Sequence, residues 1–362
     1  MRALVLNRYL PYTDEWEPDA QTRSAFLIRI ERWAIQRAQA LQRGTILVGQ
    51  YAVQGVPMNL NKPNSKLPVP AYEGCKVTPV DLVLEGGAMR GQFTAGVCDA
   101  FMEHGLFCDR VIGVSAGALC GWYYAAGYHG QAAYLNVKYC QDWRYLSLKS
   151  YALTGNACGR TFMFGEIPER LEPISSDLFD RSPVTFISVA SDLETGEADY
   201  HEHRSTSEGR PYLIASSSIP LVSQIVEVDG KKLLDGGTCD SVPILYSALT
   251  RPEAKRIVVC THDRSYVREP DKLHTLERQV YKDFPYYLER LEYRHIEYNR
   301  TYRALARLDE RGEAVVIWPE KPVTVSNMEK DPDALVNLYL QGYETALRLW
   351  PRIAAYLGFD AA

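Results

Sequence analysis

A serine between two glycines is the first feature of the sequence that could do chemistry. Residues 113–117 read GVSAG, a G-x-S-x-G pattern with Ser115 at its centre and Gly113 and Gly117 at its ends. A serine on a sharp strand-to-helix turn needs small neighbours, because the backbone doubles back, and its hydroxyl then stands beside free amides at a helix N-terminus. An apolar run precedes the pattern and a small-residue run follows it. Ser115 is therefore predicted to be a nucleophile, with a structural turn as the alternative.

A glycine-rich segment lies a few tens of residues before this serine. Residues 86–91 read GGAMRG and directly follow the apolar run DLVLE. Small residues let the amides near Gly87 and Ala88 point at one spot, where they could stabilise a developing oxyanion, while Arg90 would hold the loop or attract an anionic headgroup. The candidate oxyanion-loop residues are Gly86, Gly87, Ala88, Met89, Arg90 and Gly91. A plain tight turn is the alternative.

The same segment departs from a dinucleotide-binding loop. Ala88 stands where the second glycine of G-x-G-x-x-G belongs. An acidic residue at the expected spacing of about 20 residues, after a second strand, is not evident either. An oxyanion loop therefore fits the segment better than a nucleotide site.

An aspartate at the end of a later apolar run is the third candidate. Residues 233–243 read LLDGGTCDSVP, so Asp235 closes a short predicted strand and two glycines follow it. Glycines at this point permit close packing against a neighbour. A carboxylate there either forms a turn or acts as a general base, and the pattern alone does not separate the two.

Histidines offer further chemistry. A Ser-Asp-His triad needs a histidine late in the chain, and His262 follows a predicted strand, whereas His274 and His295 fall in predicted helices. A triad through His262 therefore stays open. His201 and His203 would share one face of a strand, but the sequence offers no third ligand beside them, so no metal site is predicted.

Together the three segments resemble one family. A glycine-rich loop, then G-x-S-x-G, then Asp-Gly-Gly is the order of the patatin-like phospholipases, and EGGAMRGQFTAGVCDAFMEHGL is similar to their bacterial branch. ASSSIPLVSQIVEVDGKKLLDGG resembles the segment before the family's catalytic aspartate. The resemblance covers about residues 79–265. Ala88 is a departure, because many members have a third glycine there, although an alanine with a negative φ would still present its amide.

The resemblance implies a three-layer α/β/α fold and a Ser-Asp dyad that uses no cofactor and no metal. Ser115 would attack an ester carbonyl, Asp235 would accept its proton, and the loop amides would stabilise the oxyanion. A carboxylate with the ordinary pKa of about 3.9 is a weak base, so the site is expected to shield Asp235 from water. The expected substrate is a lipid or simple carboxylic ester, with chain length and headgroup left open.

Two other functions are compatible with the same motifs. The chain could be a non-catalytic module that binds membrane lipid, although the presence of both Ser115 and Asp235 argues against a decayed enzyme. It could also be an acyltransferase that uses the dyad to deliver the acyl group to an alcohol or amine. Product analysis with and without an added acceptor separates transfer from hydrolysis.

The elements that position these residues follow from the apolar pattern. From Val80 onward, short apolar runs such as VDLVLE, VTFISVASDL and RIVVC alternate with helical segments. This alternation predicts an α/β fold with a mostly parallel central sheet covered by helices on both faces. Ligands bind at the C-terminal ends of such strands, and both glycine-rich turns fall there.

Three regions differ in character. Residues 1–78 are predicted to be an N-terminal extension and linker, residues 79–265 the catalytic domain, and residues 266–362 a mainly helical C-terminal extension with a closing helix at 331–357. Residues 22–44 predict a basic amphipathic helix, which could lie on an anionic membrane surface or pack on its own domain.

The composition excludes several classes. Hydrophobic residues make up 46% and charged residues 23%, as in ordinary globular proteins. The net charge of −5 provides no basic field for nucleic acid. Eight cysteines without a C-x-x-C pair, and an N-terminus without a secretory pattern, predict a cytoplasmic protein. No uninterrupted apolar stretch reaches about 18 residues, so any membrane contact, at the inner surface, is expected to be peripheral. The oligomeric state is left open.

Overall fold

The computed structural model describes residues 47–48, 51–52, 71–75 and 77–359. The chain divides into two compact units, residues 1–73 and residues 74–362. In the first unit, the short strands β1 (Leu47–Val48) and β2 (Tyr51–Ala52) pair antiparallel. The amphipathic helix predicted at residues 22–44 lies outside the described residues.

The second unit contains one sheet and the helices around it. Its strands are β3 (Val77–Leu84), β4 (Phe107–Val114), β5 (Thr185–Asp192), β6 (Ala198–Glu202), β7 (Val226–Val228), β8 (Lys231–Asp235), β9 (Lys255–Val259) and β10 (Val315–Ile317). Its α-helices are α3 (Gly91–Glu103), α4 (Ala116–Ala125), α5 (Gln131–Tyr139), α6 (Leu148–Thr154), α7 (Ser176–Asp180), α8 (Thr206–Ser216), α9 (Ile244–Thr250), α10 (His274–Val280), α11 (Pro285–Glu310) and α12 (Pro332–Leu357). Its other helical segments are η1 (Ala88–Arg90), the π-helix η2 (Phe162–Leu171) and η3 (Gly236–Thr238).

The sheet is mostly parallel, as predicted. Its order is β10-β9-β3-β4-β5-β8-β7, with β6 also paired to β5. The five strands from β10 to β5 run parallel, whereas β6 and β8 run antiparallel to β5, and β7 runs antiparallel to β8. The C-terminal halves of the central strands β3 and β4, Leu82–Leu84 and Val111–Val114, are apolar and buried, as expected for parallel strands covered on both faces.

The register of the sheet brings two distant segments to the same level. Val114, the last residue of β4, pairs with Val189 of β5, and Asp235, the last residue of β8, pairs with Ala190 of β5. Residue 115 therefore leaves the sheet on one side of β5 at the level where Asp235 ends β8 on the other side. The strand register alone thus places Ser115 and Asp235 at one edge of the sheet.

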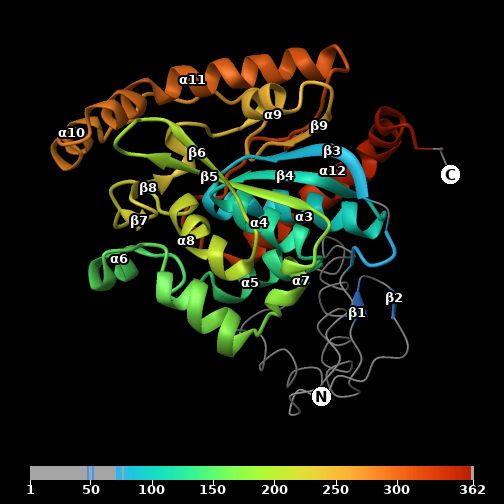
Figure 1. Cartoon of the computed structure of the whole chain (residues 1–362), viewed down its shortest axis with the longest axis horizontal. Helices are drawn as coiled ribbons and strands as arrows, with labels where there is room; N and C mark the ends of the chain where they lie inside the picture. Colours follow the sequence, from blue (N-terminus) through green and yellow to red (C-terminus); the bar gives the residue numbers. More distant parts are fainter. Residues whose placement is uncertain (1–46, 49–50, 53–70, 76, 360–362) are drawn as a thin grey trace. The chain divides into compact units, whose positions relative to one another are not determined.

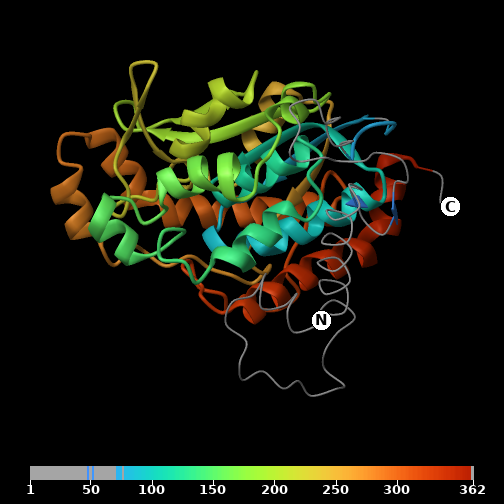
Figure 2. The same ribbon diagram turned by 90° about the horizontal axis from the view of Figure 1, so that it is seen from below.

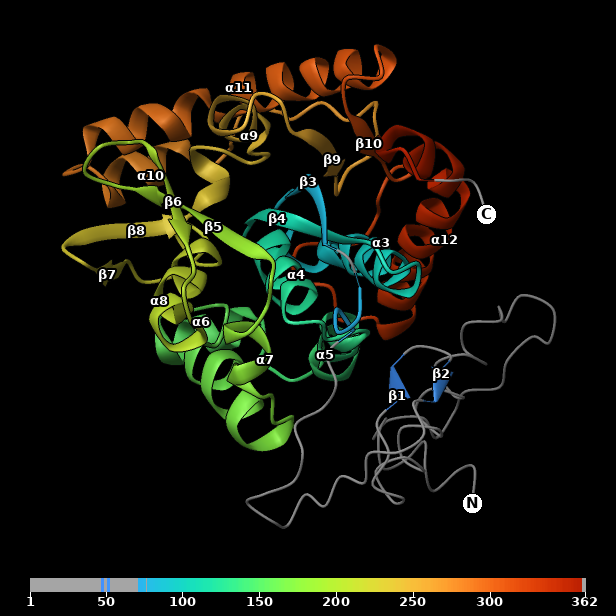
Figure 3. The same cartoon turned by 45° about the vertical axis from the view of Figure 1, so that its right-hand side comes forward.

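Helices cover both faces of the sheet and complete the three layers. α9 and α11 lie on one face, and α3, α4, α8 and α12 lie on the other (Figures 1 and 3). On the first face, Val83 and Ile112 of the sheet pack in one cluster with Tyr302 and Leu305 of α11. The predicted α/β/α fold class is confirmed.

The C-terminal region is part of the same unit. β10 extends the sheet beside β9, and α12, red in Figure 2, packs along α3. The helices predicted within 270–312 and 331–357 are present as α10, α11 and α12, and α12 is capped by Asp331, whose carboxylate accepts the Asp333 amide. The division at residue 265 remains a prediction from sequence character. Within the described ranges, no helix has both the length and the apolar character needed to cross a membrane.

Candidate active site

Ser115 occupies a strained turn between β4 and α4. Its φ and ψ are 53° and −120°, and α4 begins at the next residue. A non-glycine residue at positive φ is costly, and such strain is concentrated at functional sites. The turn holds the Ser115 side chain at the C-terminal edge of the sheet, at the N-terminus of α4.

The glycines around Ser115 are required by direct backbone contact. A Cβ on Gly113 would lie 2.5 Å from the carbonyl oxygen of Gly117, and a Cβ on Gly117 would lie 2.4 Å from that of Leu84. Both distances are far shorter than a carbon–oxygen contact allows. The G-x-S-x-G pattern is therefore a steric requirement of this turn, as the sequence predicted.

Asp235 ends β8 and reaches the Ser115 hydroxyl. The carboxylate lies close enough to that hydroxyl to interact with it, and it accepts a hydrogen bond of 2.8 Å from the Gly237 amide. Gly236 is needed as well, because a Cβ there would lie 2.2 Å from the Val189 carbonyl oxygen of β5. The Asp-Gly-Gly sequence thus lets the chain turn close against β5 while it fixes the carboxylate.

Burial makes Asp235 a stronger base than an exposed aspartate. Loss of solvation raises the pKa of its carboxyl, whereas the Ser115 hydroxyl, the Gly237 amide and the charges of Arg294 and Arg268 lower it, and the net direction is upward. This agrees with the expected shielding of the carboxylate from water. The raised pKa brings the group closer to that needed for removing a proton from a hydroxyl.

Ser216 is a supporting residue that the sequence analysis did not identify. Its hydroxyl, at the end of α8, accepts a hydrogen bond of 2.9 Å from the Ser115 amide and donates one of 2.6 Å to the Val189 carbonyl oxygen. It therefore ties the strained turn to β5. The small-residue stretch ASSS contains it, but nothing in that pattern distinguishes one serine from the next.

The oxyanion-loop candidates lie against the Ser115 turn. A Cβ on Gly86 would lie 3.2 Å from the Cβ of Ser115, and one on Gly91 would lie 2.8 Å from that of Ala116. In the part of the chain that the structure describes, the amides of Gly87 and Ala88 donate no hydrogen bond. Two unpaired amides in a loop that packs against the Ser115 turn are available to stabilise an oxyanion.

The other loop residues anchor this segment. The Met89 amide donates to the carbonyl oxygen of Asn327 at 3.4 Å, and the Arg90 guanidinium donates to its Oδ1 at 2.6 Å. Ala88 has a φ of 48°, so the expected negative φ is wrong. The sharp turn places Ala88 in the left-handed region, and this conformation costs about 1–2 kcal/mol for a residue with a Cβ.

A buried carboxylate, which the sequence analysis read as part of the strand, fixes the start of the loop. Glu85 accepts hydrogen bonds from the Thr261 amide at 2.6 Å and from the hydroxyls of Tyr298 at 2.5 Å and Tyr302 at 2.7 Å. Both tyrosines belong to α11. Burial raises the pKa of Glu85, against the effect of these three donors. Helix α11 of the C-terminal region therefore holds Glu85, the residue that directly precedes Gly86.

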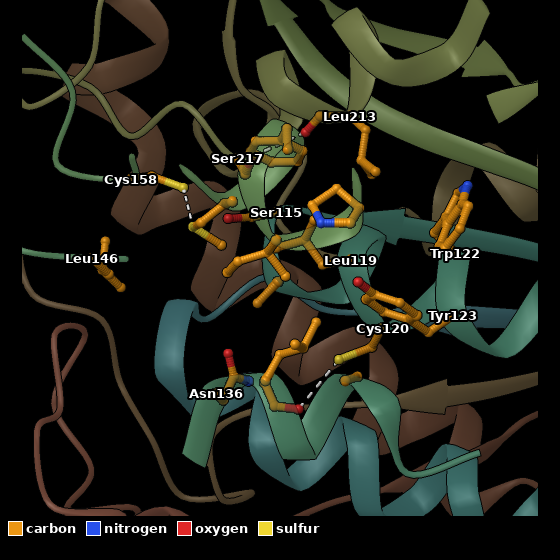
Figure 4. Close-up of a pocket in the computed structure, with 18 of the residues that line it drawn as sticks. Ser115, Leu119, Cys120, Trp122, Tyr123, Asn136, Leu146, Cys158, Leu213 and Ser217 are labelled. Atoms are coloured by element: carbon orange, nitrogen blue, oxygen red, sulfur yellow. Dashed lines mark hydrogen bonds between the residues drawn. The ribbon is translucent and has the colours of Figure 1, made fainter. Parts of the chain in front are cut away.

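An apolar cavity of about 130 Å³ opens beside Ser115. Its walls come from α4, α5, η2 and α8, and Ser115 lies among Leu119, Leu213, Cys158 and Ser217 (Figure 4). A cavity that is lined mainly by apolar side chains and has one reactive hydroxyl suits a hydrophobic chain attached to a polar reacting group. The wall from η2 was not predicted, because the π-helix carries an internal proline, Pro168.

The histidines play other parts in the structure. His262 stacks on Tyr266 at 3.7 Å, and burial, together with the charges of Arg90 and Arg268, lowers its pKa to about 3. His203 lies beside Ser188, at 2.7 Å, and His201 pairs with Glu208. Among the described residues, no group of three or more histidine, cysteine or acidic side chains could hold a metal ion.

Comparison with known proteins agrees with this geometry. The family model of patatin-like phospholipase matches residues 82–247, and that of a domain of unknown function, DUF6363, matches residues 284–358. The chain is 29% identical over 192 residues to the lysophospholipase NTE1 of Meyerozyma guilliermondii. The aligned segment covers 49% of this chain and 12% of that protein. It is 26% identical to an uncharacterized NTE family protein of Mycobacterium bovis, over 49% of each chain.

Among solved structures, VipD from Legionella pneumophila aligns with 81% of this chain and 72% of its own, at 13% identity and a TM-score of 0.44. The chain spans only part of its sequence relatives: the aligned segment is a small part of the Meyerozyma guilliermondii protein and about half of the Mycobacterium bovis protein. The family match spans the Ser115 turn, the oxyanion loop and Asp235. Residues 82–247 of this chain therefore match the patatin-like phospholipase domain.

Proposed function

We propose that the chain hydrolyses carboxylic esters of lipids through an acyl-serine intermediate on Ser115. The observation that carries the proposal is the proximity of the Ser115 hydroxyl to the buried Asp235 carboxylate, beside an apolar cavity that Ser115 lines. The family match and the relatives named lysophospholipase support the same class of reaction.

The reaction follows from the positions of these groups. Asp235 accepts the Ser115 proton while Ser115 Oγ bonds to the ester carbonyl carbon, and the amides of Gly87 and Ala88 donate to the oxyanion. The tetrahedral intermediate collapses as the ester C–O bond breaks, and the proton held by Asp235 passes to the departing alkoxide. Water then gives a proton to Asp235 while its oxygen bonds to the acyl carbon. The bond between that carbon and Ser115 Oγ breaks, the proton returns from Asp235 to Oγ, and the fatty acid is released.

The raised pKa of Asp235 predicts the acid limb of the pH profile. The carboxylate must be ionised to accept the proton, so kcat/KM should fall as the pH drops through the raised pKa. The limb should therefore lie above the ordinary aspartate value of about 3.9. Initial rates on a soluble short-chain ester, measured between about pH 3 and pH 9 with folding checked at each end, locate it. A limb at or below about 3.9 contradicts the assignment of Asp235 as the base.

Product analysis tests the proposed reaction. Purified protein is incubated with a radiolabelled acyl ester, with and without an added alcohol or amine acceptor, and a fluorophosphonate probe is used to label the nucleophile. Hydrolysis predicts free fatty acid in both incubations and covalent labelling at Ser115. Acyl transfer to the acceptor in place of fatty acid release favours the acyltransferase reading. Binding of lipid without turnover or labelling favours the lipid-binding module.

A further inference from the structure

Three arginines near Ser115 and Asp235 have no carboxylate partner in a salt bridge. They are Arg90 of η1, Arg268 in the loop after β9, and Arg294 of α11. Elsewhere in the described part of the chain, buried or half-buried arginines such as Arg110 and Arg251 pair with carboxylates. The three half-buried arginines form no such pair, and the buried Nε atoms of Arg90 and Arg294 have no hydrogen-bond partner there. Guanidinium groups partly withdrawn from water without a paired carboxylate are costly, so an anionic group of a bound substrate would stabilise them.

Arg268 and Arg294 lie near the base, and Arg90 lies near Arg268. Arg294 Nη2 and Asp235 Oδ1 each lie 3.0 Å from the point where a Cβ on Gly237 would stand. The Arg268 guanidinium lies 5.4 Å from the centre of the Tyr298 ring, and its backbone is tied to Asn299 of α11 by two hydrogen bonds. Arg268 is close enough to repel both Arg90 and Arg294, since its charge lowers the pKa of each.

The arginines and the apolar cavity lie on opposite sides of Ser115. α11 lies on one face of the sheet, and the cavity walls from α4 and α8 lie on the other (Figure 3). With the acyl chain in the cavity and the ester carbonyl at Ser115, the departing alcohol points toward the arginines. A glycerol phosphate places its charge only a few bonds from that ester, and guanidinium groups bind phosphate oxygens in pairs.

We propose that Arg268 and Arg294, with Arg90, bind the phosphate of a glycerophospholipid at the leaving-group side of Ser115. This subsite rests on the proposed function, and it makes the enzyme prefer phosphate-bearing esters over neutral glycerides. It also assigns a task to the C-terminal region, because Arg268 and Arg294 both lie beyond the segment that the phospholipase family model matches. Arg294 is also attracted by Asp235 and Asp271, so a role confined to holding the base is the alternative that the experiment must separate.

Matched substrates test the subsite. 1-Octanoyl-lysophosphatidylcholine and 1-octanoylglycerol carry the same acyl chain and are used below their aggregation thresholds. The readout is the ratio of kcat/KM for the phospholipid to kcat/KM for the glyceride. Arg268→Gln and Arg294→Gln should each lower this ratio about tenfold, the size expected for a lost charge-assisted contact. Arg300→Gln, a control on the exposed side of the same helix, should not change the ratio.

The outcomes separate the alternatives. An equal loss on both substrates would mean that the arginines act on Asp235 or on folding, and would overturn the subsite. If the ratio is unchanged, and inorganic phosphate alters glyceride turnover in wild type but not in Arg268→Gln, the arginines form a free-anion site instead. If wild type releases octanoate from the glyceride and Ser115→Ala does not, the proposed function is supported at any value of the ratio. Absence of Ser115-dependent release from both substrates rejects the proposed function and the subsite together.

Discussion

Replacement of Ser115 by alanine should lower kcat for ester hydrolysis by at least about four orders of magnitude, the size measured when a serine nucleophile is removed. Alanine can keep the turn, because the glycines at 113 and 117 provide the space around it. The loss therefore reports the missing hydroxyl and not a collapsed site. Steady-state rates on a short-chain chromogenic ester measure it, with circular dichroism as the check on folding.

Asp235→Asn belongs to the same prediction, because the amide keeps the shape of the side chain but cannot accept the serine proton. A loss of about three to four orders of magnitude is expected, as in other sites where the carboxylate beside the base or nucleophile is replaced. His262→Ala is the comparison variant, since His262 stacks on Tyr266 and has no recorded contact with Ser115 or Asp235 in the described structure. Near-normal rates in Asp235→Asn together with a large loss in His262→Ala would instead indicate a histidine base.

Gly342→Ala should destabilise the folded protein strongly. At Gly342, α12 crosses α3 so closely that a Cβ on this residue would lie 2.0 Å from the Phe93 carbonyl oxygen. A Cβ on Gly96 of α3 would likewise lie 2.1 Å from the Tyr339 carbonyl oxygen. One methyl group must therefore push the helices apart and disturb the hydrogen bond of 2.8 Å from the Tyr339 hydroxyl to the buried Asp99. Overpacking of this kind costs about 1–3 kcal/mol or more, which exceeds the gain of up to about 1 kcal/mol in helix propensity.

Gly165→Ala is the matched control for this helix crossing. A Cβ on Gly165 would have no atom within 4 Å, and its φ is not positive, so its free energy of unfolding should change by no more than about 1 kcal/mol. Urea unfolding followed by fluorescence measures both variants. Equal midpoints for Gly342→Ala and wild type would mean that α12 does not pack against α3 at this distance. A loss would show that the C-terminal helix stabilises the unit that carries Ser115.

The sequence by itself determined the local chemistry of the site. Gly113, Gly117 and Gly236 could be recognised because a sharp turn beside a serine or aspartate needs small residues, which appear as glycines at fixed spacing. Which backbone each glycine meets depends on the fold, since Gly117 lies against Leu84 and Gly236 against Val189. The alternation of apolar runs with helical segments likewise predicted the mostly parallel sheet, whose register places Ser115 and Asp235 on either side of β5.

Tertiary structure decided the supports of that site. Glu85 and Tyr298 are 213 residues apart in the chain, so no local pattern could pair the carboxylate with α11. The contact between Ser115 and Ser216 and the proximity of Arg268 and Arg294 to the base arise in the same way, from elements that the folded sheet brings together. The need for small residues at a sharp turn is local, so the sequence shows it directly. Burial, buried hydrogen bonds and charge proximity depend on which distant elements pack together, and only the folded chain determines them.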